Sequence, residues 1–145
     1  MTITFDQARA IVDAAIAHGQ QQGFQPLTVA VLDPGGALVA LGRQDGSGFL
    51  RPDLAIGKAW GLLGLGMTNR ALVARAAESP EIYASIVALA HEHAARYRNG
   101  LPVRDADGRL LGAVGVSGDA SLNDEAAALA GISEAGLIGQ TGAEQ

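Results

Sequence analysis

The chain has 145 residues, a net charge of −5 and no cysteine. Its length suits one domain, residues 1–145, that is large enough to bury a core. The negative charge and the lack of a basic run argue against a nucleic-acid partner, and the absence of cysteine excludes disulfides and thiolate chemistry. No signal peptide is visible, and the longest apolar run, 54–67, is interrupted and too short to span a bilayer. We therefore expect a cytoplasmic protein with no membrane partner.

The first third of the chain predicts a helix followed by a β-hairpin. Apolar residues spaced by three and four follow Thr4, a capping residue, and predict a helix from Phe5 to about Gln22. An apolar, β-branched run predicts a strand over Leu27–Leu32. The sequence Asp-Pro-Gly-Gly at 33–36 is typical of a tight turn, so we expect a second strand over Leu38–Leu41.

A second helix, from about residue 52 to Thr68, is apolar on nearly every face. Lys58 is its only charge between Leu54 and Asn69. Such a helix is buried on more than one side, which in a domain this small indicates a subunit interface. We therefore expect a homo-oligomer that buries part of this helix.

A third helix and an extended segment follow. The helix is expected from about Pro80 to His93, and residues 96–104 are expected to be extended with a break at 99–100. The apolar stripe of this helix consists of Ile82, Ile86, Leu89 and Ala90.

A strand and a helix close the chain. An Asp-Ala-Asp-Gly turn at 105–108 leads into an apolar strand, and Ser121 is a candidate cap for a helix from about Leu122 to Leu137. The tail after Gly139 is expected to fray. The residues that this last helix should bury are Leu122, Ala126, Leu129, Ala130, Ser133 and Leu137.

These elements define a fold class. Their order, helix-strand-strand-helix-helix-strand-strand-helix, uses hairpins rather than βαβ crossovers. It predicts an α/β protein of the α+β type, with a mainly antiparallel sheet and helices on its faces. The glycines lack the G-x-G-x-x-G spacing, which disfavours a dinucleotide site.

The chain is organised around a glycine corner, residues 115–119, where the last long strand meets the last helix. Gly115, Ser117 and Gly118 are small enough to let another backbone or a ligand approach. Asp124 and Glu125 lie in the first turn of the helix, where the helix dipole favours carboxylates. The corner is therefore either a packing feature or an anion or small-ligand site.

Lys58 is a charge on an apolar helix, so it needs a partner, because an unpaired buried ammonium costs several kcal/mol. The candidate partners are Asp33, Asp45, Asp124 and Glu125. One alternative is a structural salt bridge. In the other, Lys58 contacts a ligand carboxylate or carbonyl, or acts as a base or nucleophile with a lowered pKa. In both versions we expect Lys58 to point toward the glycine corner.

The three histidines have different environments in the sequence. His18 lies at the edge of the first helix's apolar stripe, near the helix end, where an imidazolium would complement the dipole. His91 and His93 diverge by about 200° on a helix and do not form a metal signature, so no metal site is expected.

Two polar segments contain arginines. Arg43 with Asp45, and Arg96 with Tyr97, are either solvated surface or ligand-binding rims that contact an anion. Tyr97 and His91 also have side chains suited to acid/base roles.

Four motifs resemble the GlcG/HbpS-like family of small haem-binding or haem-degrading-type proteins, to which a domain of some corrinoid adenosyltransferases also belongs. They are residues 29–45, the lysine-bearing stretch 55–59, residues 100–104, and residues 111–118 with 124–125. The resemblance implies a profilin-like three-layer α/β/α sandwich around a five-stranded antiparallel sheet. It also implies a higher homo-oligomer, with hexamers and octamers as candidates. The segment 81–100, which is helical and contains histidines here, departs from the family pattern.

Three hypotheses about function follow. The first is a small-ligand-binding protein, with haem or a related tetrapyrrole as cofactor, His18 or a pocket residue at the iron and arginines at the propionates. The second is an enzyme acting on a small oxygenated metabolite, in which Lys58, Asp124 and Glu125 transfer protons. The third is an accessory oligomer without chemistry of its own.

Overall fold

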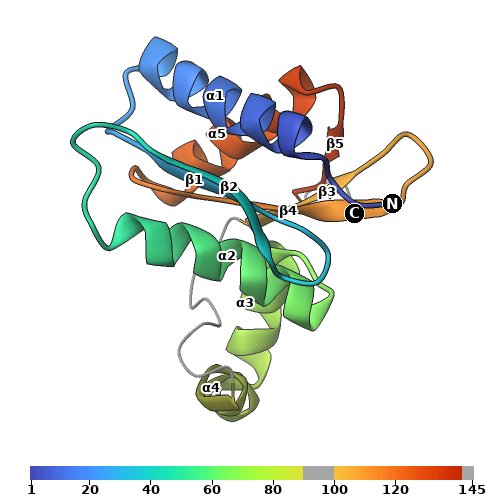
Figure 1. Ribbon diagram of the computed structural model, residues 1–145. Coiled ribbons are helices and arrows are strands. Elements are labelled where there is room, and N and C mark those ends of the chain that lie inside the picture. Colours follow the sequence, from blue (N-terminus) through green and yellow to red (C-terminus); the bar gives the residue numbers. More distant parts are fainter. Residues whose placement is uncertain (90–99, 142–145) are drawn as a thin grey trace.

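A computed structural model describes residues 1–89 and 100–141 of the chain. A five-stranded sheet lies between two helical layers, with α1 and α5 on one face and α2 on the other (Figure 1). This confirms the expected α/β/α arrangement. The elements are α1 (Phe5–Gln22), β1 (Thr28–Leu32), β2 (Leu38–Arg43), α2 (Arg51–Leu65), α3 (Asn69–Glu78), α4 (Pro80–Leu89), β3 (Gly100–Arg104), β4 (Leu110–Ser117), α5 (Ser121–Glu134) and β5 (Ile138–Gly139).

The strands are ordered β2-β1-β4-β3-β5 and every pairing between them is antiparallel. β4 is the central strand and is longer than its neighbour β3. In the described part of the chain their pairing begins at Gly100 opposite Gly115, so Val116 and Ser117 extend beyond the start of β3. On its other side β4 stays paired to β1 as far as Ser117, opposite Thr28. This end of β4 is the place where the candidate site forms.

The first helix forms as the sequence predicts. Thr4 and Gln7 make a reciprocal capping box, and Gly23 in the left-handed conformation ends the helix. α1 packs closely on α5 at Gly131. A Cβ at this position would lie 2.6 Å from the Ile11 carbonyl oxygen, so only glycine fits there. This layer covers the main core, which contains β-branched residues of β1 and β4.

α2 covers the opposite face of the sheet. Ala59 and Leu62 pack against Leu32 and Ala113 in a second, smaller core cluster. Ala55 and Ala59 also meet Gly115 of β4. Six residues of the helix are buried within this one chain: Ala55, Gly57, Lys58, Ala59, Gly61 and Leu62. The apolar character of α2 is therefore explained in large part by the sheet, and only its outer side remains for a subunit interface.

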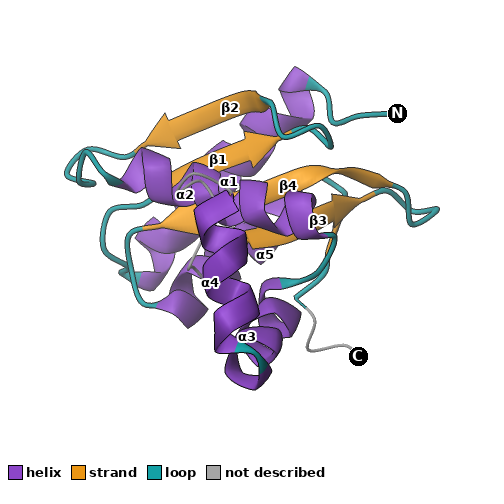
Figure 2. Cartoon of the chain, turned by 90° about the horizontal axis from the view of Figure 1, so that it is seen from below, coloured by secondary structure: helices purple, strands orange, loops and turns teal. Residues whose placement is uncertain are grey.

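An unexpected helix follows α2. The long helix expected up to Thr68 instead ends at Leu65, where Gly66 takes the left-handed conformation, and Thr68 caps the separate helix α3. α3 lies in residues 69–78, for which the sequence analysis predicted no helix. α3 and α4 project beyond α2 (Figures 1 and 2).

The expected apolar stripe of α4 is not buried in the chain. Ile82 is 58% exposed and Leu89 is 78% exposed. The four residues expected to continue this helix to His93 lie outside the described residues.

The expected burial of α5 is wrong in detail. Leu122 is 68% exposed, Ser121 is the first helical residue rather than the cap, and Ala120 occupies the cap position without a side-chain bond. The buried residues are instead Asp124, Glu125, Ala127, Ala128, Gly131 and Ile132. The reason is that α5 turns its small residues toward α1 and brings two carboxylates to the glycine corner.

The tail beyond α5 adds a short strand that the sequence pattern did not predict. Ile138 and Gly139 pair with Arg104 and Val103 as β5. Thr141 is buried, so the chain stays attached to the domain past Gly139, where fraying was expected.

Candidate functional site

The central feature of the glycine corner is a buried ion pair. The Nζ of Lys58 lies 3.2 Å from Oδ2 of Asp124 and donates a hydrogen bond of 2.5 Å to the backbone oxygen of Val116. The two side chains are only 8% and 3% exposed. Lys58 therefore points toward the corner, as we expect from the sequence.

This pair joins the two faces of the sheet. Lys58 belongs to α2 and Asp124 belongs to α5, and these helices lie on opposite faces (Figure 1). The lysine reaches across at the end of β4, next to the carbonyl of Val116, which lies beyond the first described residue of β3. The Lys58 ammonium therefore reaches the Asp124 carboxylate at the end of the central strand.

Asp124 is held from a second side. Its Oδ1 accepts a hydrogen bond of 2.9 Å from the backbone N–H of Asp119. Asp119 in turn accepts bonds from the backbone N–H groups of Gln25 and Ala120 and from the side chain of Asn123. These bonds lower the pKa of Asp119, the one from Gln25 most strongly. The carboxylate of Asp124 is therefore fixed in position before any ligand arrives.

Burial shifts both members of the ion pair toward neutrality. Desolvation lowers the pKa of Lys58, against the opposing attraction of Asp124, and the nearby Arg51 guanidinium lowers it further. Desolvation likewise raises the pKa of Asp124, against the opposing charge of Lys58. A buried pair of this kind can exchange a proton, but it is equally typical of a structural ion pair.

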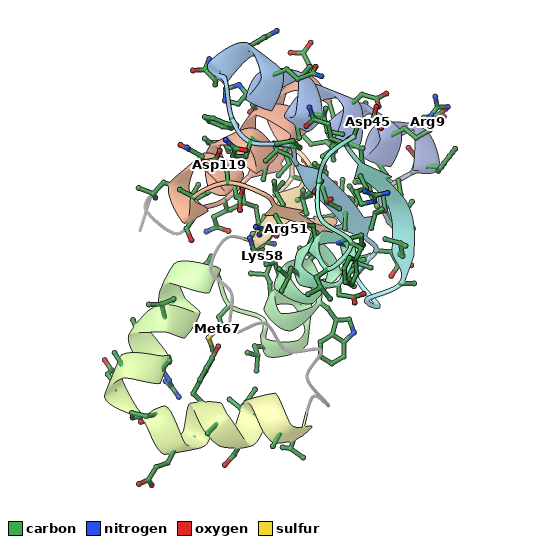
Figure 3. All side chains as sticks on the ribbon, turned by 90° about the vertical axis from the view of Figure 1, so that its left-hand side faces the viewer. Arg9, Asp45, Arg51, Lys58, Met67 and Asp119 are labelled. Carbon is green, nitrogen blue, oxygen red and sulfur yellow. The ribbon has the colours of Figure 1, made fainter. Side chains whose placement is uncertain are left out.

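Other polar side chains continue from the corner toward β2. Arg51 donates to the hydroxyl of Ser117, at 3.0 Å, and lies next to Lys58 (Figure 3). The hydroxyls of Thr28 and Ser47 are hydrogen-bonded at 2.8 Å, and Arg43 donates to the Ser47 carbonyl at 2.7 Å. Sequence reasoning missed Arg51, whose position one residue before a proline at a helix start was the available signal.

Two glycines of the corner lie in close contact with backbone, as in the packing alternative given above. A Cβ at Gly115 would lie 1.9 Å from the carbonyl oxygen of Ala55 in α2. A Cβ at Gly118 would lie 2.3 Å from the carbonyl oxygen of Pro26. Protein backbone therefore occupies the space above both residues.

The remaining candidates are separated from one another. Glu125 is buried beside the corner, Arg43 and Asp45 are exposed, and Asp33 binds the N–H groups of its own turn rather than Lys58. Arg96 and Tyr97, with His91 and His93, lie outside the described residues.

His18 is half-buried on α1, on the face of the sheet opposite α2. Its ring meets Phe24 edge-on, with 5.9 Å between the ring centroids. Arg43 does not lie beside it: Gly42 faces α1, at Val12 and Ile16, so the next residue of the strand points to the α2 face. The structure therefore does not bring the expected iron ligand and this arginine together.

A pocket of about 300 Å³ lies at the other end of α2. Arg104 of β3 and Gln140 contribute polar groups to it, and Leu62 and Leu63 contribute apolar wall. Sequence reasoning missed this site. The available signal was the alternation of β3, which places Arg104 on the same face as Pro102.

No helix among the described residues has both the length and the apolar character needed to cross a membrane. No curated protein matches the sequence.

Solved structures do match the fold. A PduOC–heme complex superimposes with a TM-score of 0.82 and 20% identity, covering 97% of this chain and 99% of that one. The ORFY protein of Klebsiella pneumoniae has a TM-score of 0.80 and 20% identity, over 94% of this chain and 92% of that one.

HbpS structures show higher identity. A double mutant of HbpS from Streptomyces reticuli is 26% identical, with a TM-score of 0.77, and the match covers 92% of this chain and 86% of that one. The family model described as "Haem degrading protein HbpS-like" matches residues 3–133, nearly the whole chain. The protein is therefore a member of the HbpS-like family.

Proposed function

We propose that this chain binds haem or a related tetrapyrrole, with His18 as the axial ligand of the iron. The observation that carries the proposal is the half-buried imidazole of His18 at the surface of α1, in a chain that belongs to the HbpS-like family. A neutral imidazole nitrogen is a common protein ligand of haem iron. The heme bound in one structural neighbour, the PduOC complex, supports the same ligand class.

The donor chemistry around His18 fits such a ligand. Phe24 packs against the imidazole edge-on and limits its rotation, which favours one orientation of the ring. Bound haem would supply iron-centred redox or gas-binding chemistry, while the chain supplies the nitrogen donor and the adjacent apolar surface. His18 is the only histidine in the part of the chain that the structure describes.

The helices around His18 contain few cations, so this proposal does not include the arginine–propionate contacts considered in the sequence analysis. Arg9 is the only arginine or lysine in α1 and α5, and its guanidinium lies over the Phe5 ring, 5.6 Å from the centroid. The binding free energy on this face is therefore expected to come from iron ligation and apolar contact rather than from propionate pairing.

A hemin titration followed in the Soret region tests the proposal. The wild-type protein is expected to shift and sharpen the band with saturation, and His18→Ala is expected to weaken binding at least tenfold, roughly 1.4 kcal/mol. Gln22→Ala, one turn further along α1, is the matched control and should bind hemin like the wild type. An unchanged titration for His18→Ala would contradict His18 as ligand, and no saturable binding by the wild type would contradict the function itself.

We also propose that the protein assembles with copies of itself, as a hexamer or an octamer. The apolar surface that supports this lies on α4, where Ile82 and Leu89 are exposed, and in the loop before α2, where Phe49 is 86% exposed. Light scattering at micromolar concentration should give a mass several times that of one chain. A stable monomer would contradict the assembly.

A second candidate function is proton transfer on a small oxygenated metabolite at the Lys58–Asp124 pair. The lowered pKa of Lys58 and its neighbour Arg51 are the observations that favour it. If it is right, Lys58→Met should keep the fold and the assembly but lose turnover of a metabolite identified by library screening. Full turnover by this variant would contradict it.

A further inference from the structure

The pocket at the end of α2 is lined by both apolar and polar residues. Leu62, Leu63, Met67 and Leu110 form the apolar wall, and Thr68, Arg104 and Gln140 contribute polar groups. Met67 lies two residues beyond the end of α2, just after the Gly66 cap (Figure 3). The volume of about 300 Å³ lies at the lower end of the range for small-molecule sites. Its size and lining suit a small amphipathic molecule.

Arg104 has donor capacity that the fold does not use. Its Nε donates to Oε1 of Gln140 at 3.3 Å, and its Nη1 donates to the carbonyl of Gly108 at 3.2 Å. A guanidinium has five N–H groups. Within residues 1–89 and 100–141, no carboxylate lies within ion-pair distance of it. Both bonds go to neutral oxygens, so the charge of this half-buried side chain is not compensated by an anion there.

The start of α3 adds a second positive feature to the same pocket. Thr68 caps this helix of 10 residues, its hydroxyl accepts from the N–H of Ala71, and both residues line the pocket. The positive end of the helix dipole therefore lies at the pocket wall, where it favours an anion. Arg104 and the helix start come from different parts of the chain and favour the same sign of ligand charge.

We propose that this pocket binds a small monocarboxylate with an apolar body. The carboxylate would accept hydrogen bonds from Arg104, and the hydrocarbon part would contact the leucines and Met67. The leucines and Met67 that line the pocket together with Arg104 favour an aliphatic carboxylate over inorganic phosphate, which has no group to place against them.

This site is independent of the haem proposal. The pocket lies on the α2 face of the sheet, whereas His18 lies on α1, on the opposite face (Figure 1). Failure of one proposal therefore leaves the other intact, and hemin is absent from the experiment below.

The experiment is a titration of the full chain with hexanoate, followed by backbone amide chemical shifts and by calorimetry. Hexanamide serves as a ligand of the same shape without the charge, and inorganic phosphate as an anion without the apolar body. Arg104→Gln removes the proposed anion contact. Arg109→Gln, an exposed arginine at the start of the neighbouring strand, is the matched control.

Saturable hexanoate shifts at Leu63, Thr68 and Leu110 are expected, with at least tenfold weaker binding for Arg104→Gln and none of this loss for Arg109→Gln. Arg104→Lys, which keeps the charge, should recover part of the affinity and guards against a folding defect. Absence of saturable shifts in the wild type would overturn the proposal. Equal binding of hexanoate and hexanamide would overturn the role of Arg104, and tighter binding of phosphate than of hexanoate would overturn the ligand class.

Discussion

The two faces of the sheet have different chemistry. The α1–α5 face contains His18, many acidic residues and a single arginine, Arg9. The α2 face contains Lys58, Arg51, the arginines at the two ends of the sheet and the pocket. The imidazole that we propose as the iron ligand therefore lies on one face, and the arginine that we propose to bind an anion lies on the other.

Two cations of the α2 face, the buried Lys58 and the half-buried Arg104, show how this difference arises. Lys58 is satisfied by the fold itself, because the staggered end of β4 lets it reach Asp124 on the other face. Arg104 has only neutral partners among the described residues. A cation that the fold neutralises contributes to stability and position, whereas one with neutral partners is ready to bind an anion from outside.

The largest expected effect comes from removing the carboxylate that joins the faces. Asp124→Ala leaves Lys58 buried without its partner, which should cost about 3–5 kcal/mol of unfolding free energy. Chemical denaturation measures this, with Asp13→Ala on the exposed side of α1 as the control. A loss below about 1 kcal/mol would show that the pair does not hold the faces together.

Lys58→Met should have a smaller effect. It removes the desolvated ammonium and keeps the volume of the stem, and Asp124 retains the bond from Asp119 and can take up a proton. The expected loss is about 1–3 kcal/mol, the cost of an incompletely satisfied buried group. The double variant Lys58→Met with Asp124→Leu should recover much of the stability, and a double variant less stable than either single one would contradict this.

The two members of the ion pair should change the unfolding free energy with pH in opposite senses, Asp124 at acidic pH and Lys58 at alkaline pH. The raised pKa of Asp124 means that the folded state holds a proton that the unfolded state has released, so stability falls as pH rises from about 4 through the raised pKa. The lowered pKa of Lys58 means that stability rises with pH between that pKa and about 10.4.

Lys58→Met should abolish the alkaline rise and extend the acidic fall to higher pH, because it removes the charge that lowers the pKa of Asp124. Denaturation midpoints measured across the pH range check this. An alkaline limb unchanged by the substitution would assign the effect to another group.

The smallest stability effect is expected at Arg104. Arg104→Gln removes two hydrogen bonds to neutral oxygens at a half-exposed site, which should cost about 1 kcal/mol or less. Thermal unfolding measures it beside Asp124→Ala. A loss as large as that of Asp124→Ala would make Arg104 structural and remove the contrast between the two cations.

Local sequence patterns predicted much of this fold. The Thr4 cap, the turn at 33–36 and the apolar run of β4 are short-range signals, and the helix and strands they predict are present. The same reasoning could not predict β5. A strand of two residues has no periodicity, and it forms here only by pairing with the edge of β3. α3 was missed because residues 69–78 were given no element, and Thr68 was taken as the end of one helix rather than as the cap of the next.

The candidate site was only partly predictable, for a related reason. An isolated lysine on an apolar helix requires a partner, so a carboxylate near Lys58 was expected, but the sequence left Asp33, Asp45, Asp124 and Glu125 as candidates and the structure selects Asp124. The closeness of α2 to Gly115, and the meeting of Arg104 with Gln140, depend on tertiary packing between segments far apart in the chain. No local pattern encodes those contacts.

The central claim is that haem binds on the α1 face through His18, separately from the cations of the α2 face. The most direct test is a hemin titration of the wild type, His18→Ala and Arg104→Gln side by side, followed in the Soret region. We predict that His18→Ala weakens hemin binding at least tenfold and that Arg104→Gln binds hemin like the wild type. Weaker binding by Arg104→Gln with an unchanged His18→Ala would contradict this claim and place the tetrapyrrole on the α2 face.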